Sequence, residues 1–452
     1  MTATESHVPS HLRGNGAPVQ EELTLTDLEI TGTIPAELDG RYLRNGANPI
    51  TGMSDHPFLG DGMIHGMRIR DGQADWYRNR YVQTPFISEP DREVIEIDSS
   101  LREMDSSKAN THIVGHGGKY LALEEGHFPY ELDGELNTLG PLDYDGKLKG
   151  AFTAHPKICP TTGEMLAFGY YFLEPHLTYL RVSPKGELLQ SEVISSVGGP
   201  TMMHDFNVTE NNVIFMDLPA VFDLELAMQG QMPIVWDESY RSRLGVMPRT
   251  GTNDDVVWYD VDPCYVFHPL NSYEDGDKII LDVARFSHIW RDGPMDFPDP
   301  VLWRWTIDQT TGTVTEEQID DRPAEFPRVA DNVIGHKHRY GYLMAQPTPE
   351  GYRNPAAAEG ALLKYDRESG TRTSIELGRG KSPGEAVFAP AADSKNEDDG
   401  YLMTYVFDAE TERSDFVIFD AATMSNEPIA SVHLPRVPSG FHGSWIPTTV
   451  AD

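Results

Sequence analysis

The chain has 452 residues, and 39% of them are hydrophobic, which is enough for a full core. Its 71 acidic and 36 basic residues give a formal net charge of −35, which argues against nucleic acid as a partner because phosphates need clustered Lys and Arg side chains. Anionic membrane surfaces would also repel such a chain.

The sequence contains no run of about 18 apolar residues and no basic start followed by an apolar stretch. Cys159 and Cys264 are its 2 cysteines, and they lack the C-x-x-C spacing of a thiolate metal site. These features predict a protein of a reducing compartment, and we expect it in the cytoplasm.

The first 20 residues are rich in Ser, Pro, Gly and Glu. Such a composition buries too little apolar surface to hold a fixed structure, so residues 1–20 are predicted to form a mobile tail. Residues 21–452 are predicted to form a single domain.

Short apolar strands that meet at Gly-containing turns recur along the rest of the chain. Asp-Gly pairs supply the positive φ of tight hairpins, and they occur at Asp71-Gly72, Asp275-Gly276 and Asp399-Gly400. Longer turns are predicted around Gly186, Gly312 and Gly370.

Long amphipathic helices are nearly absent, and the best helical stretch, residues 223–229, is short. Many hairpins without alternating helices predict an all-β repeat architecture, either a series of sandwiches or a propeller. A propeller is favoured because residues from blades far apart in the sequence can converge on its axis.

Four histidines in apolar or proline-marked contexts are spread over most of the chain. The contexts are Thr-Ala-His155-Pro-Lys, Met-Met-His204-Asp-Phe, Val-Phe-His268-Pro-Leu and Gly-Phe-His442-Gly-Ser. Neutral imidazole is a good ligand for iron, copper, nickel or zinc. Only a closed, repeating fold could gather these four residues around one metal.

Three segments also place glutamates in apolar surroundings, namely Leu-Ala-Leu-Glu124-Glu125-Gly, Ala-Glu325-Phe-Pro and Pro-Gly-Glu385-Ala-Val. A buried carboxylate needs a partner, and the N–H of a metal-bound imidazole is a suitable one.

With these motifs the chain resembles the carotenoid cleavage oxygenase family, which also includes stilbene-cleaving enzymes. The resemblance begins at Gly40-Arg-Tyr-Leu-Arg-Asn-Gly, continues through Phe58-Leu-Gly-Asp-Gly-Met-Ile-His65 and Asn110-Thr111, and ends at Gly-Ser-Trp445. All four histidine contexts and the three glutamate contexts occur in the family's order.

The resemblance implies a seven-bladed β-propeller with a cap of loops and short helices over an axial metal. It implies that His155, His204, His268 and His442 bind Fe(II). It further implies that Glu125, Glu325 and Glu385 accept hydrogen bonds from His204, His268 and His442 respectively, which leaves His155 without such a partner. No catalytic acid or base is required.

The implied reaction is the oxidative cleavage of a carbon–carbon double bond of a carotenoid or apocarotenoid by O2, which gives two carbonyl products. Thr111 matches a family threonine beside the oxygen-binding position. An apolar polyene needs a long tunnel, and the candidates for lining it are Phe128, Phe152, Tyr171, Phe172, Phe267 and Trp290.

The segments 218–228 and 232–236 are apolar and could form a rim that takes lipid from a membrane in a transient peripheral contact. Core that connects two blades is the alternative interpretation of both segments.

Two other functions stay open. A phenolic stilbene or phenylpropenoid could be the substrate on the same fold, although such family members carry a lysine where this chain has Glu124. A calcium-dependent propeller lactonase, or a propeller without catalysis, would hold its metal through carboxylates and carbonyls. The identity of the metal separates these classes.

Overall fold

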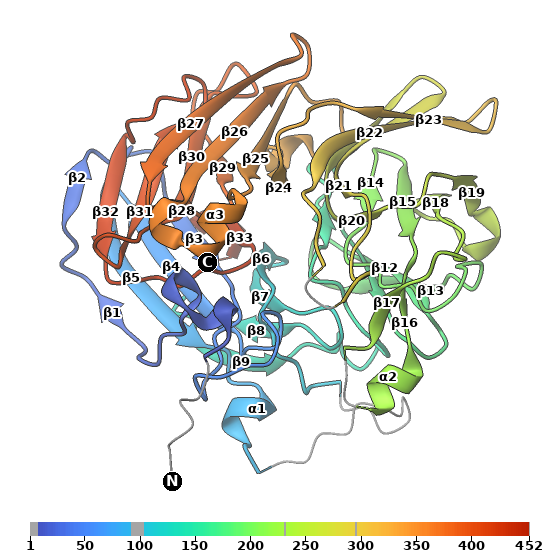
Figure 1. The fold of residues 1–452 in the computed structure, drawn as a ribbon, viewed down its shortest axis with the longest axis horizontal. Coiled ribbons are helices and arrows are strands. Elements are labelled where there is room, and N and C mark those ends of the chain that lie inside the picture. Colours follow the sequence, from blue (N-terminus) through green and yellow to red (C-terminus); the bar gives the residue numbers. More distant parts are fainter. Residues whose placement is uncertain (1–7, 92–103, 230–231, 294–295, 452) are drawn as a thin grey trace.

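The structure is a computed structural model that describes residues 8–91, 104–229, 232–293 and 296–451. Its sheets follow one another in chain order around a common centre, from blue to red in Figure 1. Together they make the predicted seven-bladed β-propeller, in which each sheet is open and none is closed on itself.

Blade 1 is a five-stranded sheet at the start of the chain. Its strands, in spatial order, are β1 (Thr24–Leu25), β5 (Gln73–Tyr81), β4 (Met63–Arg70), β3 (Gly40–Arg44) and β33 (Gly443–Pro447).

Blades 2 to 5 are antiparallel sheets of four strands, and in each the first strand is at one edge of the sheet. Blade 2 has β6 (His112–His116), β7 (Lys119–Leu123), β8 (Tyr130–Leu132) and β9 (Thr138–Pro141). Blade 3 has β10 (Lys157–Ile158), β11 (Met165–Tyr170), β12 (Leu177–Val182) and β13 (Leu188–Val193). Blade 4 has β14 (Asn207–Val208), β15 (Asn212–Asp217), β18 (Arg243–Pro248) and β19 (Val257–Asp260). Blade 5 has β20 (Tyr265–Asp275), β21 (Lys278–Phe286), β22 (Val301–Asp308) and β23 (Thr313–Gln318).

Blades 6 and 7 are joined into one ten-stranded sheet. Blade 6 has β24 (Ala324–Arg328), β25 (Tyr340–Ala345), β26 (Glu359–Asp366) and β27 (Thr371–Arg379). Blade 7 has β29 (Val387–Pro390), β30 (Gly400–Asp408), β31 (Arg413–Asp420), β32 (Ala430–Leu434) and β2 (Ile30–Gly32). The joining strand is β28 (Lys381–Pro383), which pairs parallel with β26 and antiparallel with β30.

Both ends of the chain close the ring. The C-terminal strand β33 pairs antiparallel with β3, and the N-terminal strand β2 pairs antiparallel with β32. The first and last blades are therefore each built from both ends of the chain, which leaves no open gap between them.

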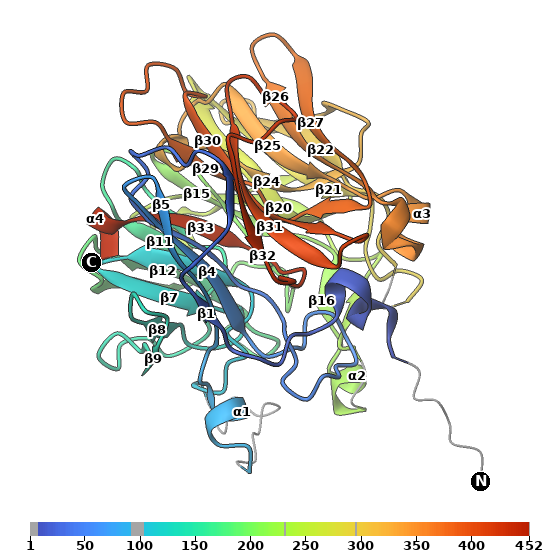
Figure 2. The same cartoon turned by 90° about the vertical axis from the view of Figure 1, so that its left-hand side faces the viewer.

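The helices are short. They are α1 (Pro85–Ser88), α2 (Leu224–Met228), α3 (Pro349–Arg353) and α4 (Thr448–Ala451), with 3-10 turns at Asn253–Asp255, Asp331–Val333 and Pro355–Ala357. The helix predicted at residues 223–229 is α2, which Asp223 caps by accepting hydrogen bonds from the amides of Glu225 and Leu226. In both Figure 1 and Figure 2, α1 and α2 project from the same side of the ring. No helix among the described residues is long and apolar enough to span a membrane.

Most of the predicted hairpin turns are confirmed. Asp71 and Gly72, with φ of 49° and 73°, connect β4 to β5, and Gly276 connects β20 to β21. The turn predicted at Asp399-Gly400 is wrong, because Gly400 already lies in β30. A Cβ at Gly400 would lie 2.4 Å from the carbonyl oxygen of Ala389, so the glycine permits a close backbone approach within the blade.

Residues 8–20 are more ordered than their composition predicts, whereas residues 1–7 lie outside the described part of the chain. Residues 8–20 form the 3-10 turns η1 (Ser10–Leu12) and η2 (Gly14–Gly16). Two hydrogen bonds link Asn48 to the backbone of Val19, and Arg436 donates to the carbonyl oxygens of Ala17 and Pro18. This segment packs on the propeller because side chains of the ring satisfy its backbone.

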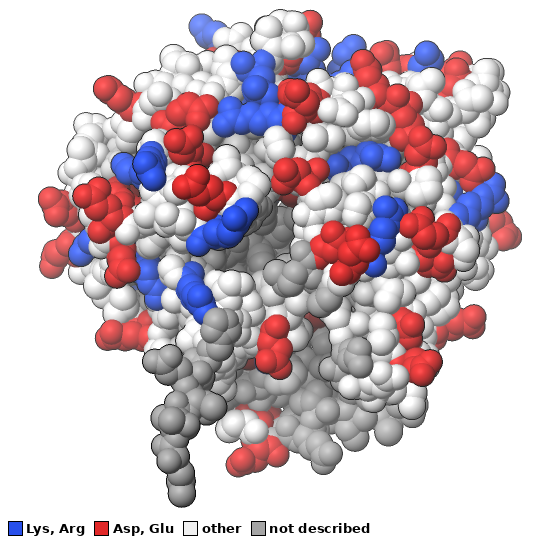
Figure 3. Space-filling model, in the orientation of Figure 1, with Lys and Arg blue, Asp and Glu red and all other residues white. Residues whose placement is uncertain are grey.

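Acidic and basic side chains are interspersed on the face of the molecule shown in Figure 3. The surplus of acid is thus spread over this surface, as expected for a solvated exterior.

Candidate metal centre

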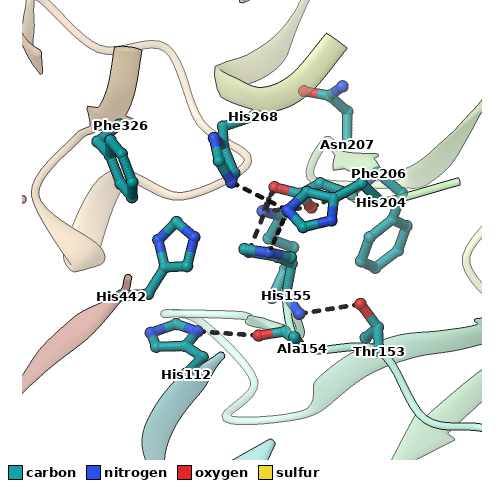
Figure 4. Close-up of polar contacts among 12 residues, drawn as sticks. His112, Thr153, Ala154, His155, His204, Phe206, Asn207, His268, Phe326 and His442 are labelled. Atoms are coloured by element: carbon teal, nitrogen blue, oxygen red, sulfur yellow. Dashed lines mark hydrogen bonds and ion pairs between the residues drawn. The ribbon is translucent and has the colours of Figure 1, made fainter. Parts of the chain in front are cut away.

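The four histidines singled out in the sequence meet in the structure. His155 lies just before β10, His204 precedes β14, His268 is on β20, and His442 directly precedes β33 (Figure 4). His155, His204 and His268 therefore lie at or beside the first strands of blades 3, 4 and 5 respectively. His442 lies beside the strand that closes blade 1. A ring of blades brings such positions together although they are far apart in the sequence.

The imidazoles converge through their Nε2 atoms. The Nε2 of His204 is 3.0 Å from that of His155 and 3.1 Å from that of His268. The His442 ring lies 4.6 Å from the His155 ring and 4.6 Å from the His268 ring, measured between centroids. One nitrogen from each of the four lies within 4.8 Å of the others, and all four side chains are largely buried.

Carboxylates hold the opposite nitrogen of three rings. The Nδ1 of His268 is 2.7 Å from Glu325 and that of His442 is 3.0 Å from Glu385, while Nδ1 of His204 contacts Glu125. The pairing of glutamates with histidines is the one implied by the family resemblance. Glu125 follows β7, Glu325 is on β24, and Glu385 lies between β28 and β29.

This arrangement fits a metal ion. A carboxylate acceptor places the proton of a neutral imidazole on Nδ1, so the lone pair of Nε2 is free to bind a cation. Several such lone pairs facing one another at about 3 Å repel each other unless a cation lies between them. Two nitrogens at about 2.1 Å from a metal, and at right angles, would be about 3.0 Å apart.

Burial favours the neutral, metal-binding form of these rings. It lowers the pKa of His155 and of His442 well below the ordinary value, and it lowers the pKa of His268 to about 3. Burial opposes the charged form of His204 as well, but the neighbouring Glu125 outweighs it and raises the pKa of that ring.

A fifth histidine, His112, lies beside the cluster and was not singled out in the sequence. Its ring is 5.4 Å from that of His442 and 6.0 Å from that of His155. The Nδ1 atom is 2.9 Å from the carbonyl oxygen of Ala154, and Nε2 is 3.3 Å from the hydroxyl of Ser444. His112 is the first residue of β6, so blade 2 also contributes a side chain to the axis.

His155 has a different partner from the other three. Its Nδ1 lies 3.8 Å from Asp205, whose carboxylate forms an ion pair with Lys157 at 2.8 Å. Asp205 directly follows His204 in the sequence, so it was visible within that histidine's motif. Nothing in the sequence indicated that its partner would be His155.

Phe326 is a second residue that the sequence did not reveal. Its ring stacks on His268 at 5.4 Å and lies 5.1 Å from His442. The φ of Phe326 is 52°, which is costly for a bulky residue, and its amide donates to the Glu325 carboxylate. The unusual backbone thus turns Phe326 toward the rings of His268 and His442 (Figure 4), and the Phe326 amide holds the Glu325 carboxylate.

A cavity of about 420 Å3 reaches the histidine cluster. Its wall includes three of the four histidines, His155, His268 and His442. Charged and polar side chains share this wall, namely His112, Lys157, Asp205, Asn207, Asn271, Ser272, Arg328, Asp331, Asn332, Glu385 and Ser444.

The six aromatic residues predicted to line a substrate tunnel are absent from the wall of this cavity. Phe267 lies 5.2 Å from the His204 ring and is therefore beside the cluster, and Trp290 packs against Phe267 at 6.1 Å between ring centroids. Tyr171 and Phe172 contact each other at 4.2 Å between ring centroids, and Phe172 is 6.1 Å from Phe222.

The prediction for Phe152 is wrong. Its side chain is fully buried and stacks on Tyr144 within the core between blades 2 and 3. Phe128 packs against the same core and is partly buried. Aromatic residues in β proteins are mostly core, which is why sequence context alone overestimates the tunnel.

Thr111 and Glu124 are near the cluster but have internal partners. The carbonyl oxygen of Thr111 accepts a hydrogen bond from the amide of His442, and its hydroxyl donates to Asn110. Glu124 accepts from the Ser107 hydroxyl at 3.0 Å, the Gly126 amide at 2.7 Å and the His127 Nδ1 at 2.8 Å.

The predicted apolar rim divides into two parts. Leu218, Ala220 and Val221 are buried in the core. Leu224 and Met228 on α2 are exposed, with 44% and 71% of their surface accessible. The exposed apolar side chains of residues 218–228 are therefore on the helix, whereas residues 232–236 are partly buried, with Met232, Ile234 and Trp236 packed against the core.

Comparisons with known proteins identify the family of the chain. The profile of the family described as retinal pigment epithelial membrane protein matches residues 16–447. A carotenoid cleavage oxygenase of Mycobacterium tuberculosis is 40% identical over 99% of both chains. The crystal structure of a lignostilbene dioxygenase from Pseudomonas brassicacearum has a TM-score of 0.87 and 30% identity, over 97% of this chain and 98% of the other. The cobalt-substituted apocarotenoid oxygenase of Synechocystis has a TM-score of 0.84 and 27% identity, over the same shares of the two chains. The chain belongs to the carotenoid cleavage oxygenase family.

Proposed function

We propose that the protein is an iron(II)-dependent dioxygenase that cleaves a carbon–carbon double bond of a carotenoid or apocarotenoid. One alkene and one O2 molecule give two carbonyl compounds, and each product receives one oxygen atom. The observation that carries this proposal is the convergence of four buried imidazoles, one nitrogen of each lying within 4.8 Å of the others.

The donor set supports a redox-active metal. His155, His204, His268 and His442 would hold a divalent ion without an anionic ligand, and such a centre would keep one or two positions open. Closed structural zinc sites have no such open positions, whereas O2 chemistry requires them. Iron supplies the activation of O2, and the relatives are named as oxygenases and dioxygenases.

The protein's own residues would orient and insulate the metal. Glu325 and Glu385 fix the ring orientation of His268 and His442, and Phe326 shields one side of both rings. Phe267 and Trp290 would bound the space beside His204 with apolar surface, which suits a polyene. No proton transfer by a side chain is needed.

The substrate class rests on Glu124. Its carboxylate already accepts hydrogen bonds from Ser107, Gly126 and His127, so it offers no cation to a phenolate. A second anion placed beside it would be repelled. The alternative, a phenolic stilbene or phenylpropenoid, is favoured by the likeness to the lignostilbene dioxygenase.

We place the enzyme in the cytoplasm, with transient membrane contact through α2. Leu224 and Met228 would enter the lipid surface and bring the apolar substrate near the protein. The net charge of −35 makes uncharged lipid the expected surface.

The test has two steps. Metal analysis of purified protein should find about one iron per chain, and His268→Ala should lose most of it, while His433→Ala on β32 should keep it. Aerobic incubation with a carotenoid, an apocarotenal and a hydroxystilbene under 18O2 should label both carbonyl products of one of the first two. Stoichiometric calcium, or faster cleavage of the hydroxystilbene, would contradict the metal or the substrate respectively.

A further inference from the structure

Arg44 is a buried guanidinium without an anionic partner. Its side chain lies at the end of β3, and the residue is 2% exposed. No carboxylate in the described part of the chain lies within 4.0 Å of its nitrogens. Its Nη2 donates to the carbonyl oxygen of Pro438 at 2.6 Å, whereas Nε has no hydrogen-bond partner.

The absence of a counter-charge is unfavourable. Removing a cation from water costs several kcal/mol unless an anion or several hydrogen bonds replace the water. The ring of Tyr405, 5.4 Å from the guanidinium carbon, compensates only part of this cost. In a chain with 71 acidic residues, a buried arginine left without any of them is unexpected.

A cavity of about 210 Å3 adjoins this guanidinium. Arg44, Tyr405 and Asn15 line it, and each has a buried polar atom without a partner, namely Nε, the phenol oxygen and Oδ1. The volume exceeds that of one water molecule several times, so it can hold a small ion together with water. Phe326, Met344, Phe407 and Val437 make up much of the remaining wall.

The one acidic side chain on this wall is already neutralised. Glu385 contacts Nδ1 of His442 at 3.0 Å, accepts from the amide of Gly443 at 2.9 Å, and lies 3.5 Å from Nη1 of Arg328. The negative charge of Glu385 is therefore used by His442 and Arg328. The positive charge of Arg44 still lacks a counter-ion, and the cavity is the place where one could bind.

The N-terminal segment covers the cavity. Asn15 belongs to η2, and its carbonyl oxygen accepts a hydrogen bond from the amide of Ser439 at 2.8 Å. Arg436 holds the same segment through Ala17 and Pro18, and it also has no ion pair among the described residues. Two arginines without carboxylate partners therefore lie near this cover.

We propose that the cavity binds one small monovalent anion, with Arg44 as its charge partner and the hydroxyl of Tyr405 as a hydrogen-bond donor. Chloride is the ion of the right size and charge. The anion fastens residues 8–20 to β3 and β30, and it does so separately from the metal, which is held on the other side of Glu385.

Bromide provides a direct test, because it replaces chloride and scatters anomalously. Crystals of the full-length protein in bromide should show an anomalous peak within hydrogen-bond distance of Arg44 and Tyr405. A cavity without such a peak would overturn the proposal, and this measurement does not depend on whether a variant folds.

Thermal unfolding provides the second test. Replacing gluconate by chloride at constant ionic strength should raise the Tm by roughly 2 to 5 °C at a hundredfold excess over Kd. Arg44→Met should abolish this rise, and Tyr405→Phe should reduce it. Arg241→Met, which removes an exposed partner of Asp260, should leave it unchanged. A chloride-dependent rise that persists in both cavity variants would also overturn the proposal.

Discussion

His112 donates its Nδ1 proton to the carbonyl oxygen of Ala154 at 2.9 Å, and through this bond blade 2 supports the residue that precedes His155. The same ring approaches Ser444, which follows His442 by two residues, at 3.3 Å. Burial lowers the pKa of His112 to about 3, so the ring is neutral. It links the segment that carries His155 to the segment that carries His442.

His112→Leu is therefore expected to weaken metal binding without removing a ligand. It leaves the Ala154 carbonyl unpaired, which costs about 1–3 kcal/mol, and it frees both segments to move. The dissociation constant for Co2+, measured by its absorption spectrum, should rise about tenfold. His112→Asn should retain part of the affinity because an amide can still donate.

His116→Leu is the matched control. His116 is at the opposite end of β6, and its Nε2 donates to the carbonyl oxygen of Gly163 at 3.0 Å. The control should lower the Tm but leave the Co2+ affinity unchanged. Equal loss of affinity in both variants would mean that His112 acts only through general stability.

Glu325→Gln should weaken metal binding by about 10- to 100-fold, the usual scale for losing a carboxylate that orients a metal-bound histidine. The physical reason is that an amide holds the His268 ring less firmly and removes a negative charge near the cation. Iron content after dialysis against a chelator measures the effect. Glu187 is exposed, so the Glu187→Gln variant should retain its iron. Equal iron retention in the Glu187→Gln and Glu325→Gln variants would contradict the role of Glu325.

Asp205→Asn should also lower metal affinity, by about tenfold. The Lys157 ammonium, 2.8 Å from Asp205, would lose its counter-charge and repel a cation bound by the neighbouring His155. The double variant Asp205→Asn with Lys157→Met should recover much of the loss, because the repulsion disappears with the lysine. A double variant as weak as the single one would show that Asp205 acts by direct contact with His155 instead.

The contribution of Glu124 to stability should depend on pH. Burial opposes its ionised form, but the contact with His127 and the hydrogen bonds from Gly126 and Ser107 outweigh burial and lower its pKa to about 2. The unfolded value is near 4.3. Its stabilisation, about 3 kcal/mol at most, is thus complete above pH 4.3 and is lost as the pH falls toward 2.

Urea unfolding of wild type and Glu124→Gln at pH 7, 5 and 3.5 tests this dependence. The difference in free energy of unfolding should be largest at pH 7 and should shrink at pH 3.5. A difference that stays constant over this range would contradict the expectation. Glu124→Lys is a poorer probe, because it would leave three hydrogen-bond donors without an acceptor.

The sequence predicts the architecture and the metal centre for physical reasons that hold locally. Hairpin turns such as Asp71-Gly72 need positive φ, which favours Gly and Asp. Buried histidines need hydrogen-bond partners, which favours glutamates in apolar contexts. Both preferences can be recognised in the sequence. The family's order of motifs then pairs Glu325 with His268 and Glu385 with His442, which spacing alone could not do.

Features that depend on three-dimensional contacts were missed. His112 and Phe326 have no unusual sequence neighbours, and their position beside the cluster follows only from the closure of the ring. Phe152 looks like a tunnel residue but packs in the core, because apolar context is the same for both environments. Gly400 looks like a turn but allows a close approach between strands.

The pairing of β33 with β3 places a constraint on how the protein matures. His442 directly precedes β33, the last strand among the described residues, whereas its partner β3 is among the first. Blades 2 to 6 contain neither of these strands, so a chain in which only those blades have formed does not yet present all four imidazoles together. A complete set of four imidazoles is therefore expected only after β33 has paired with β3, and a chain cut before His442 should hold a metal through at most three of them.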